Sequence, residues 1–225
     1  MMKLMKNKTI LVVAGEPNSI FLEIFFKALK KKKFKCPIVL ICSEKILKLQ
    51  MKHFNFKRKI RILNYKKLNE YKINNKSINL ININYKHSFS FKQVSSKSND
   101  YIRQSFIVAF KIIKKFNFTK LINGPIVKKT FLQKKYLGIT EYIAKEFKIK
   151  KNAMLIYNKN LSVCPITTHL PLKSVVKKIT KKNIYEKTKL INDFYKKKLN
   201  KKPKIAILGL NPHCESVDKF NEDEK

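Results

Sequence analysis

Short apolar runs alternate along the chain with longer stretches in which apolar residues recur every three or four positions. The run Ile10–Ala14 predicts a buried strand, and residues 19–33, which carry apolar side chains at helical spacing, predict the helix that follows it. Further predicted strands cover 37–42, 121–125, 153–157, 161–166 and 204–210. Further predicted helices cover 43–53, 98–116, 140–147 and 180–199. This alternation predicts the α/β class, as an α/β/α arrangement with a largely parallel sheet.

Residues 55–95 have the least regular pattern. Asn-rich segments with alternating apolar residues predict short strands or a hairpin there. No internal repeat and no Gly-, Ser- or Pro-rich linker divides the chain, so we treat 1–225 as a single region. No apolar run approaches the roughly 18–20 residues that span a bilayer. The apolar stretch after the basic N-terminus is too short for a secretion signal, and we therefore expect a cytoplasmic protein without membrane association.

The charge of the chain changes this picture little. The formal net charge is +38, from 52 Lys and Arg against 14 Asp and Glu, but only three of the basic residues are arginine. Lys, Asn, Ile, Phe and Tyr have A/T-rich codons, so genome composition explains much of the lysine excess. Base-edge recognition favours Arg, and we expect no specific nucleic-acid partner. Weak, salt-sensitive binding to polyanions is still expected. The four cysteines have no metal-site spacing and predict reduced thiols.

Four segments that use the scarce Gly and Pro residues follow predicted strands. They are 15–17, 123–129, 167–172 and 209–213. Ligands of open α/β sheets bind outside the carboxyl ends of the strands, so these segments are candidate site loops. His169 and His213 could converge on one divalent ion, or each could bond a loop carbonyl. Lys128, close to a predicted helix start, could hold a phosphate or lie in solvent. The usual Rossmann and Walker glycine motifs are absent.

Five segments, in this order, resemble motifs of the 4-hydroxythreonine-4-phosphate dehydrogenase family. Gly15-Glu16-Pro17 resembles part of its T-P-G-E-P segment, and Asn123-Gly124-Pro125 through Lys128 resembles its T-G-P-x-x-K loop. Gly138-Ile139-Thr140-Glu141 resembles its G-H-T-E motif. The segments 167–172 (TTHLPL) and 209–213 (GLNPH) complete the set.

The resemblance implies an isocitrate/isopropylmalate dehydrogenase-like fold in a homodimer. It implies oxidation of 4-phosphooxy-L-threonine with NAD or NADP in pyridoxal phosphate biosynthesis, followed by decarboxylation. A divalent metal such as Zn, Mg or Co would be held by His169 and His213, whereas Thr140 and Lys128 would contact the substrate. Metal chelation would lower the pKa of the substrate hydroxyl and favour hydride loss. No catalytic residue is assigned.

The chain departs from the family pattern in three ways, one of which is that Ser19-Ile20-Phe21 replace the N-terminal G-I-G glycines. Ile139 stands where the family has His, and it cannot hydrogen-bond a substrate. The resemblance also implies a segment beyond residue 225 with a third metal-ligating His and most cofactor contacts, so we expect the chain to be incomplete at its C-terminus and inactive by itself. Two alternatives stay open. One is a non-catalytic, basic, polyanion-binding remnant, and the other is a related dehydrogenase acting on another phosphorylated hydroxy acid.

Overall fold

The computed structural model describes residues 9–86, 96–127, 131–132, 136 and 138–209, which form two units. The first unit runs to Tyr142 and the second begins at Ile143, within a helix. Elements of the first unit are β1 (Ile10–Val13), α2 (Phe21–Lys31), β2 (Ile38–Cys42), α3 (Glu44–His53), β3 (Ile60–Ile62), η1 (Tyr65–Glu70), β4 (Ile78–Asn82), η2 (Ser96–Ser98), α4 (Asn99–Phe116) and β5 (Leu121–Asn123). Helix α5 (Ile139–Glu146) crosses the boundary, and α6 (Leu172–Val175), η4 (Val176–Lys178), α7 (Lys181–Phe194) and η5 (Tyr195–Leu199) follow.

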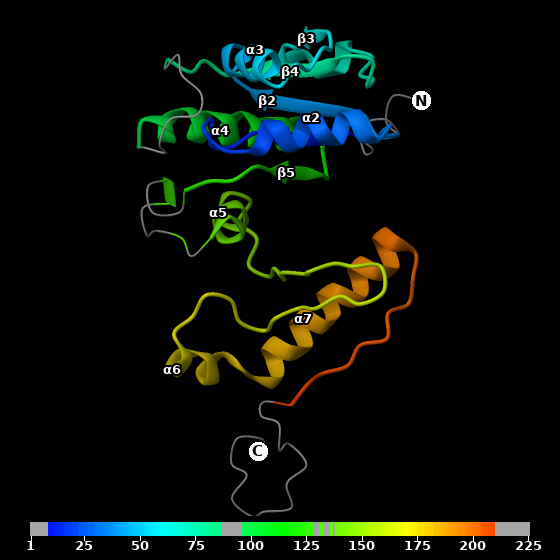
Figure 1. The fold of residues 1–225 in the computed structure, drawn as a ribbon. Coiled ribbons are helices and arrows are strands. Elements are labelled where there is room, and N and C mark those ends of the chain that lie inside the picture. Colours follow the sequence, from blue (N-terminus) through cyan, green and yellow to red (C-terminus); the bar gives the residue numbers. More distant parts are fainter. Residues whose placement is uncertain (1–8, 87–95, 128–130, 133–135, 137, 210–225) are drawn as a thin grey trace, which may run out of the picture. The chain divides into compact units, whose positions relative to one another are not determined.

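The first unit is built on a five-stranded, wholly parallel sheet with the order β3-β4-β2-β1-β5 (Figure 1). The central strands β1 and β2 are continuous apolar runs because both faces of the sheet are covered. Leu11, Val13, Leu40 and Ile41 are completely or almost completely buried. The predicted α/β/α arrangement is therefore confirmed for this unit.

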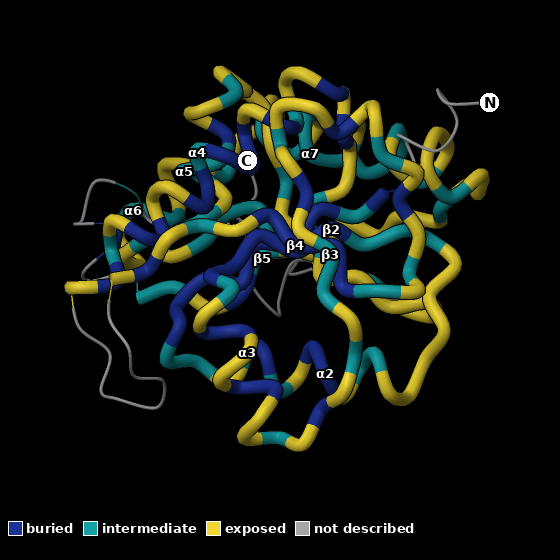
Figure 2. Tube along the Cα trace, turned by 90° about the horizontal axis from the view of Figure 1, so that it is seen from above, coloured by how far each residue is buried: buried dark blue, intermediate teal, exposed yellow. Residues whose placement is uncertain are grey.

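Helices cover the two faces of the sheet in a way that follows from the strand order. Helices α2 and α3 contact each other, whereas α4 contacts β1, β2 and η1, and the two groups lie on opposite faces (Figure 2). The chain passes from β1 to β2 in one direction, and later from β4 past β2 and β1 to β5 in the other. Right-handed crossovers that run in opposite directions lie on opposite faces of the sheet, which explains why α2 and α4 cover different faces. The change of direction lies between the neighbouring strands β1 and β5.

Aromatic side chains fill the core on each side of the sheet. Phe26 of α2 stacks on Phe56 with ring centroids 4.6 Å apart. On the α4 side, Phe106 contacts Phe131 and Tyr142 with centroids 5.8 and 5.7 Å apart. Burying each such ring contributes roughly 1.5–3 kcal/mol, so this packing stabilises both helices on the sheet.

The second unit differs from the first in its packing. Its α7 begins at Thr180, whose Oγ1 accepts a hydrogen bond from the Asn183 N–H at 3.2 Å, as an N-cap should. Among residues 145–209, however, none is buried. The sequence expectation of one undivided region stays a prediction.

Four predicted elements are corrected by the structure. The hairpin alternative for 55–95 is wrong, because β3 and β4 pair in parallel and are joined by the crossover that contains η1. The strands predicted at 153–157 and 161–166 reduce to one antiparallel bridge, Ile156–Val163. The strand predicted at 204–210 is absent over the described part, to residue 209, because no described segment pairs with it. No helix in the described ranges combines the length and apolar character required to cross a membrane.

Candidate functional site at the carboxyl edge of the sheet

The loops that follow β1 and β5 meet at the carboxyl edge of the sheet, where the strand order changes direction. The Glu16 N–H donates to the Pro125 carbonyl at 2.8 Å, and the Gly124 N–H donates to the Val13 carbonyl at 2.8 Å. Two of the four predicted site loops, 15–17 and 123–129, therefore begin where sequence analysis placed them, directly after parallel strands. Ligands of open α/β sheets bind at this kind of position.

Glycine is required on both sides of this contact. Gly15 has φ +76°, and a Cβ built on it would lie 2.3 Å from the Pro125 carbonyl oxygen. A Cβ on Gly124 would lie 2.0 Å from the Ala14 carbonyl oxygen and 2.8 Å from the Phe21 ring. Because these distances are far below van der Waals contact, any side chain here would force the two loops apart.

Glu16 is the buried polar centre of these loops. Its side-chain carboxyl group accepts a hydrogen bond from the Ser98 Oγ at 2.6 Å and from the Asn18 N–H at 3.3 Å. Glu16 is 3% exposed and forms no ion pair with any residue that the structure describes, although the chain is strongly basic. It lies next to the N-terminal end of α4, where backbone N–H groups favour negative charge.

A second set of polar side chains lies where the end of β2 meets α4. The Tyr101 hydroxyl accepts the Ser43 N–H at 3.1 Å, and its ring contacts Tyr85 with centroids 5.1 Å apart. Burial raises the pKa of the Cys42 thiol from 9.0 to about 12, and burial also raises the pKa of Tyr101 well above its ordinary value. The pKa of Tyr85 is raised by burial and by the nearby charge of Glu16. These groups therefore keep their protons at neutral pH.

Sequence analysis missed the Glu16–Ser98 contact. Ser98 is the first residue of the predicted helix 98–116, but its side chain makes no cap hydrogen bond and instead donates to Glu16, 82 positions earlier. The Gly15-Glu16-Pro17 motif pointed to Glu16, whereas no local pattern could have paired it with Ser98. Gln50 of α3 also bonds this loop, because its Nε2 donates a hydrogen bond to the Pro17 carbonyl at 3.1 Å. Hydrogen bonds with Ser98, Gln50 and Pro125 therefore hold the β1 loop in place.

Thr140, a predicted substrate contact, lies in the first turn of α5 with an exposed side chain. Gly138 directly before this helix is buried, and Ile139, which stands where the family pattern has His, is half-buried. The helix begins where the Tyr142 N–H donates to the Gly138 carbonyl. Thr140 can therefore present its hydroxyl to a ligand from the start of a helix, which is a favourable place for an anion.

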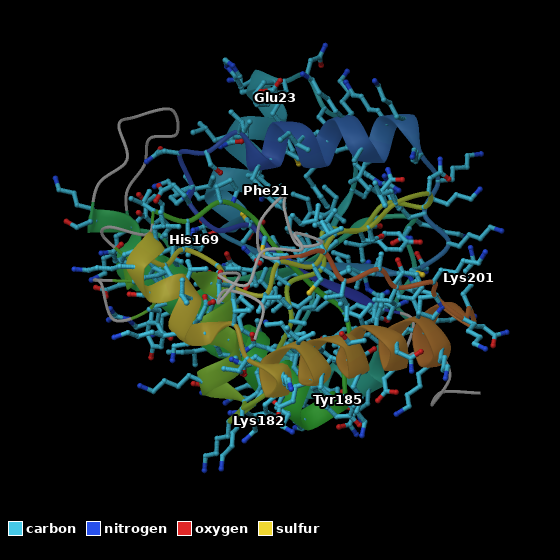
Figure 3. All side chains as sticks on the ribbon, turned by 90° about the horizontal axis from the view of Figure 1, so that it is seen from below. Phe21, Glu23, His169, Lys182, Tyr185 and Lys201 are labelled. Atoms are coloured by element: carbon cyan, nitrogen blue, oxygen red, sulfur yellow. The ribbon has the colours of Figure 1, made fainter. Side chains whose placement is uncertain are left out.

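His169, a predicted metal ligand, belongs to the second unit. It is exposed and has φ +54°, a left-handed conformation that is uncommon for residues other than glycine (Figure 3). The loop carrying it follows an isolated bridge residue, Val163, so the expectation that a strand leads into this loop is not met. Thr140 lies in the first unit, whereas His169 lies in the second.

The two remaining predicted residues, Lys128 and His213, lie outside the described residues. Within the described ranges, no three or more His, Cys, Asp or Glu side chains gather as a metal site would require. His169 alone does not fit a bound ion. The metal pair His169 and His213 therefore stays a prediction.

Comparison with known proteins agrees with the ordered motifs. The model of the family described as pyridoxal phosphate biosynthetic protein PdxA matches residues 33–225. A 4-hydroxythreonine-4-phosphate dehydrogenase of Sulfurihydrogenibium is 34% identical over 219 residues, which are 95% of this chain and 66% of the relative. The enzyme of the same name from Aquifex aeolicus is 33% identical over 224 residues, covering 97% of this chain and 67% of the relative. The chain thus spans about two thirds of the length of these relatives.

Solved structures show the same fold. A 4-hydroxythreonine-4-phosphate dehydrogenase from Klebsiella pneumoniae superposes with a TM-score of 0.77 at 23% identity, covering 92% of this chain and 65% of that one. The enzyme of the same name from Burkholderia phymatum gives a TM-score of 0.75 at 20% identity, covering 92% and 64%. With the family model matching most of its length and relatives more than 30% identical, the chain belongs to the PdxA family of pyridoxal phosphate biosynthetic proteins.

Proposed function

We propose that this chain carries part of a 4-hydroxythreonine-4-phosphate dehydrogenase. The reaction oxidises the secondary hydroxyl of 4-phosphooxy-L-threonine, with a hydride passing to NAD or NADP and a proton released, and the resulting 3-oxo acid loses carbon dioxide. The observation that carries the proposal is the family match over residues 33–225, together with relatives of that name more than 30% identical. A homodimer in the cytoplasm belongs to the same proposal.

The chain's own contribution is to bind and position the substrate. The paired loops at Gly15 and Gly124 fix the carboxyl edge of the sheet, and the second loop continues toward Lys128. Lys128 and the exposed Thr140 hydroxyl would bind the substrate phosphate, the first by charge and the second by donating a hydrogen bond. Phosphate binding at remote atoms can position the reacting carbon without taking part in the chemistry.

The metal and the nicotinamide belong to the proposal only in outline. A divalent ion, when bound, would polarise the substrate hydroxyl, and His169 and His213 are the ligands that we propose for it. The described residues supply one of this pair, His169, without a companion ligand. Titration of the chain and of His169→Ala with cobalt, followed by the absorption of the ion, tests the ligand assignment without any turnover. Equal cobalt binding by both proteins would refute it.

Ile139 favours one specific alternative, a related hydroxy acid as the substrate. An isoleucine offers no hydrogen bond where the family pattern offers an imidazole, so a substrate group that needs a partner there would bind weakly. The variant Ile139→His distinguishes the two substrates. Co-expressed with the part of the Sulfurihydrogenibium relative that this chain does not match, it should lower the KM for 4-phosphooxy-L-threonine if that compound is the substrate, and it should leave or raise the KM if another acid is.

Turnover is the direct test of the proposed function. The chain would be assayed alone and co-expressed with a polypeptide made of the part of the Sulfurihydrogenibium relative that it does not match. We expect reduction of NAD or NADP with 4-phosphooxy-L-threonine and none with threonine, which lacks the phosphate. The relative's part alone and the His169→Ala mixture are the controls, and both should be inactive. A mixture that forms a complex but reduces neither nucleotide would contradict the function.

A further inference from the structure

Helix α7 and the turn after it expose only lysines and aromatic side chains. The exposed positions between 181 and 196 are Lys181, Lys182, Tyr185, Lys189, Phe194 and Lys196. Residues three, four and seven positions apart share one side of a helix, and such spacing joins four of these residues into what we call the α7 face: Lys182, Tyr185, Lys189 and Lys196. Figure 3 shows Lys182 and Tyr185 close together near the start of the helix.

The acidic residues of this region are paired with lysines outside the α7 face. The Glu186 carboxylate pairs with the Lys151 Nζ at 2.9 Å, and Asp193 pairs with Lys197 at 3.8 Å. The hydrogen bond from Lys151 lowers the pKa of Glu186 below its ordinary value, so this acid is charged and already has its cation. No face lysine forms an ion pair with a residue that the structure describes. Three ammonium groups therefore recur about 10 Å apart along one side of the helix.

Genome composition does not account for this arrangement, because it acts on every helix of the chain. The helices of the first unit carry both charges side by side, one turn apart. The pairs are Glu23–Lys27 on α2, Glu44–Lys48 on α3 and Asp100–Arg103 on α4. The α7 face carries one sign of charge and an aromatic ring that is 66% exposed, that of Tyr185.

Single-stranded nucleic acid is the partner that this combination fits. Lysine ammonium groups contact phosphates as point charges without reading sequence, and exposed aromatic rings stack on bases. A membrane surface would require an apolar helix face, and the centre of a protein interface is depleted of charged residues, whereas three of the four face residues are lysines.

We propose that the α7 face binds single-stranded nucleic acid without sequence preference. The three face lysines contact phosphates, and Tyr185 stacks on a base. This binding is separate from the proposed oxidoreductase function, because the face contains none of the residues assigned to the metal or the substrate.

The strand preference of the full chain tests the proposal. Fluorescence anisotropy would compare a labelled single-stranded oligonucleotide with its duplex at low salt. Stacking requires unpaired bases, so the single strand should bind at least about fivefold more tightly. Charge alone would favour the duplex, whose charge density is higher. Tighter duplex binding, absence of binding, or equal displacement by polyglutamate at the same concentration of charge would overturn the proposal.

A matched pair of triple substitutions locates the contact. Lys182→Gln, Lys189→Gln and Lys196→Gln together should weaken single-strand binding at least about tenfold and flatten the slope of log affinity against log salt by about 2, since each phosphate contact contributes about 0.7. The control replaces three exposed lysines of the first unit and removes the same charge: Lys31→Gln, Lys32→Gln and Lys33→Gln. It should leave the slope nearly unchanged. Equal effects of the two triple variants would show that net charge alone binds the strand, and the proposal would be wrong.

Substitutions of Tyr185 test the stacking contact. Tyr185→Ala should weaken single-strand binding about fivefold or more, and Tyr185→Phe should keep the parent affinity because the ring remains. The side chain is largely exposed, so both variants should retain the helix, which circular dichroism checks. Parent-like affinity of Tyr185→Ala, or equal weakening by both variants, would refute stacking on this ring.

Discussion

The carboxyl group of Glu16 holds the β1 loop in place through the Ser98 hydroxyl and the Asn18 N–H. The motif around Gly15 identified this loop from the sequence because glycine and proline are scarce in the chain. The partner of Glu16 could not be identified, because a contact spanning 82 positions depends on where α4 lies on the sheet. His169 and Thr140 could be named in advance, but their surroundings depend on packing that no short motif encodes.

Removal of the Glu16 carboxyl group should destabilise the first unit. Glu16→Ala takes away a buried acceptor, and we expect a loss of about 1–3 kcal/mol in the free energy of unfolding. Glu16→Gln should lose less because an amide oxygen can still accept. Glu23→Ala is the control, since Glu23 forms only a surface ion pair with Lys27, worth about 0.5 kcal/mol or less. Urea titration measures all three, and equal losses for Glu16→Ala and Glu23→Ala would contradict the role of the buried contact.

The raised pKa of Cys42 gives the protein a defined alkaline limit. The thiol titrates at 9.0 ordinarily and at about 12 in the folded chain, so the folded state holds a proton that the unfolded state releases. This contribution to stability is fully present below pH 9 and is lost as the pH rises toward 12. The pKa of Tyr101 is also raised, but from an ordinary value of 10.0. The contribution of Cys42, whose ordinary pKa is 9.0, is therefore the first to fall as the pH rises.

Unfolding free energies measured between pH 8 and 10 test this expectation, where each such group changes the slope by up to about 1.4 kcal/mol per pH unit. Cys42→Val should flatten the slope above pH 9. Cys36→Val, at a half-buried thiol, is the comparison for replacing a cysteine elsewhere in the first unit. A Cys42→Val slope identical to that of the parent would show that the thiol is not responsible.

Helices and strands with an apolar pattern were predictable where the structure provides a neighbour for them. The helices α2, α3, α4 and α7 agree with the sequence prediction, since each carries apolar residues at helical spacing. The relation of β3 to β4 was not predictable, because the alternating pattern of a strand does not encode the direction of its neighbour. The apolar run 205–208 has the composition of a strand but has no described partner, so composition alone could not decide its structure.

The N-caps of two helices provide a matched test at this scale. Thr180 caps α7 through its side chain, whereas Ser43 at the start of α3 makes no side-chain cap hydrogen bond. Thr180→Ala should therefore reduce the helix content of 181–194, at a cost of about 1 kcal/mol. Ser43→Ala should leave the helix content of 44–53 unchanged. Backbone chemical shifts report both helices, and a frayed α3 with an intact α7 would be the opposite of what we expect.

For the whole molecule, the two units should differ in their resistance to proteolysis. The first unit has a packed core, whereas no residue between 145 and 209 is buried. Trypsin cleaves at lysine, and exposed lysines occur in both units. Cleavage requires local unfolding, which costs little where no apolar core opposes it. Brief digestion should therefore cut first after lysines between 145 and 202 and leave a fragment that retains the parallel sheet. Mass spectrometry identifies the cuts, and early cleavage within α2 or α4 would contradict this order.

The measurement that tests the central claim most directly is the stoichiometry of the proposed reaction. The chain, co-expressed with the unmatched part of the Sulfurihydrogenibium relative, would be incubated with 4-phosphooxy-L-threonine and either nicotinamide nucleotide. Reduced nucleotide and carbon dioxide would be followed together. Oxidation followed by decarboxylation predicts that the two products form in equal amounts and that both disappear without the phosphate group. Carbon dioxide without reduced nucleotide, or neither product from a complex that has assembled, would contradict a 4-hydroxythreonine-4-phosphate dehydrogenase.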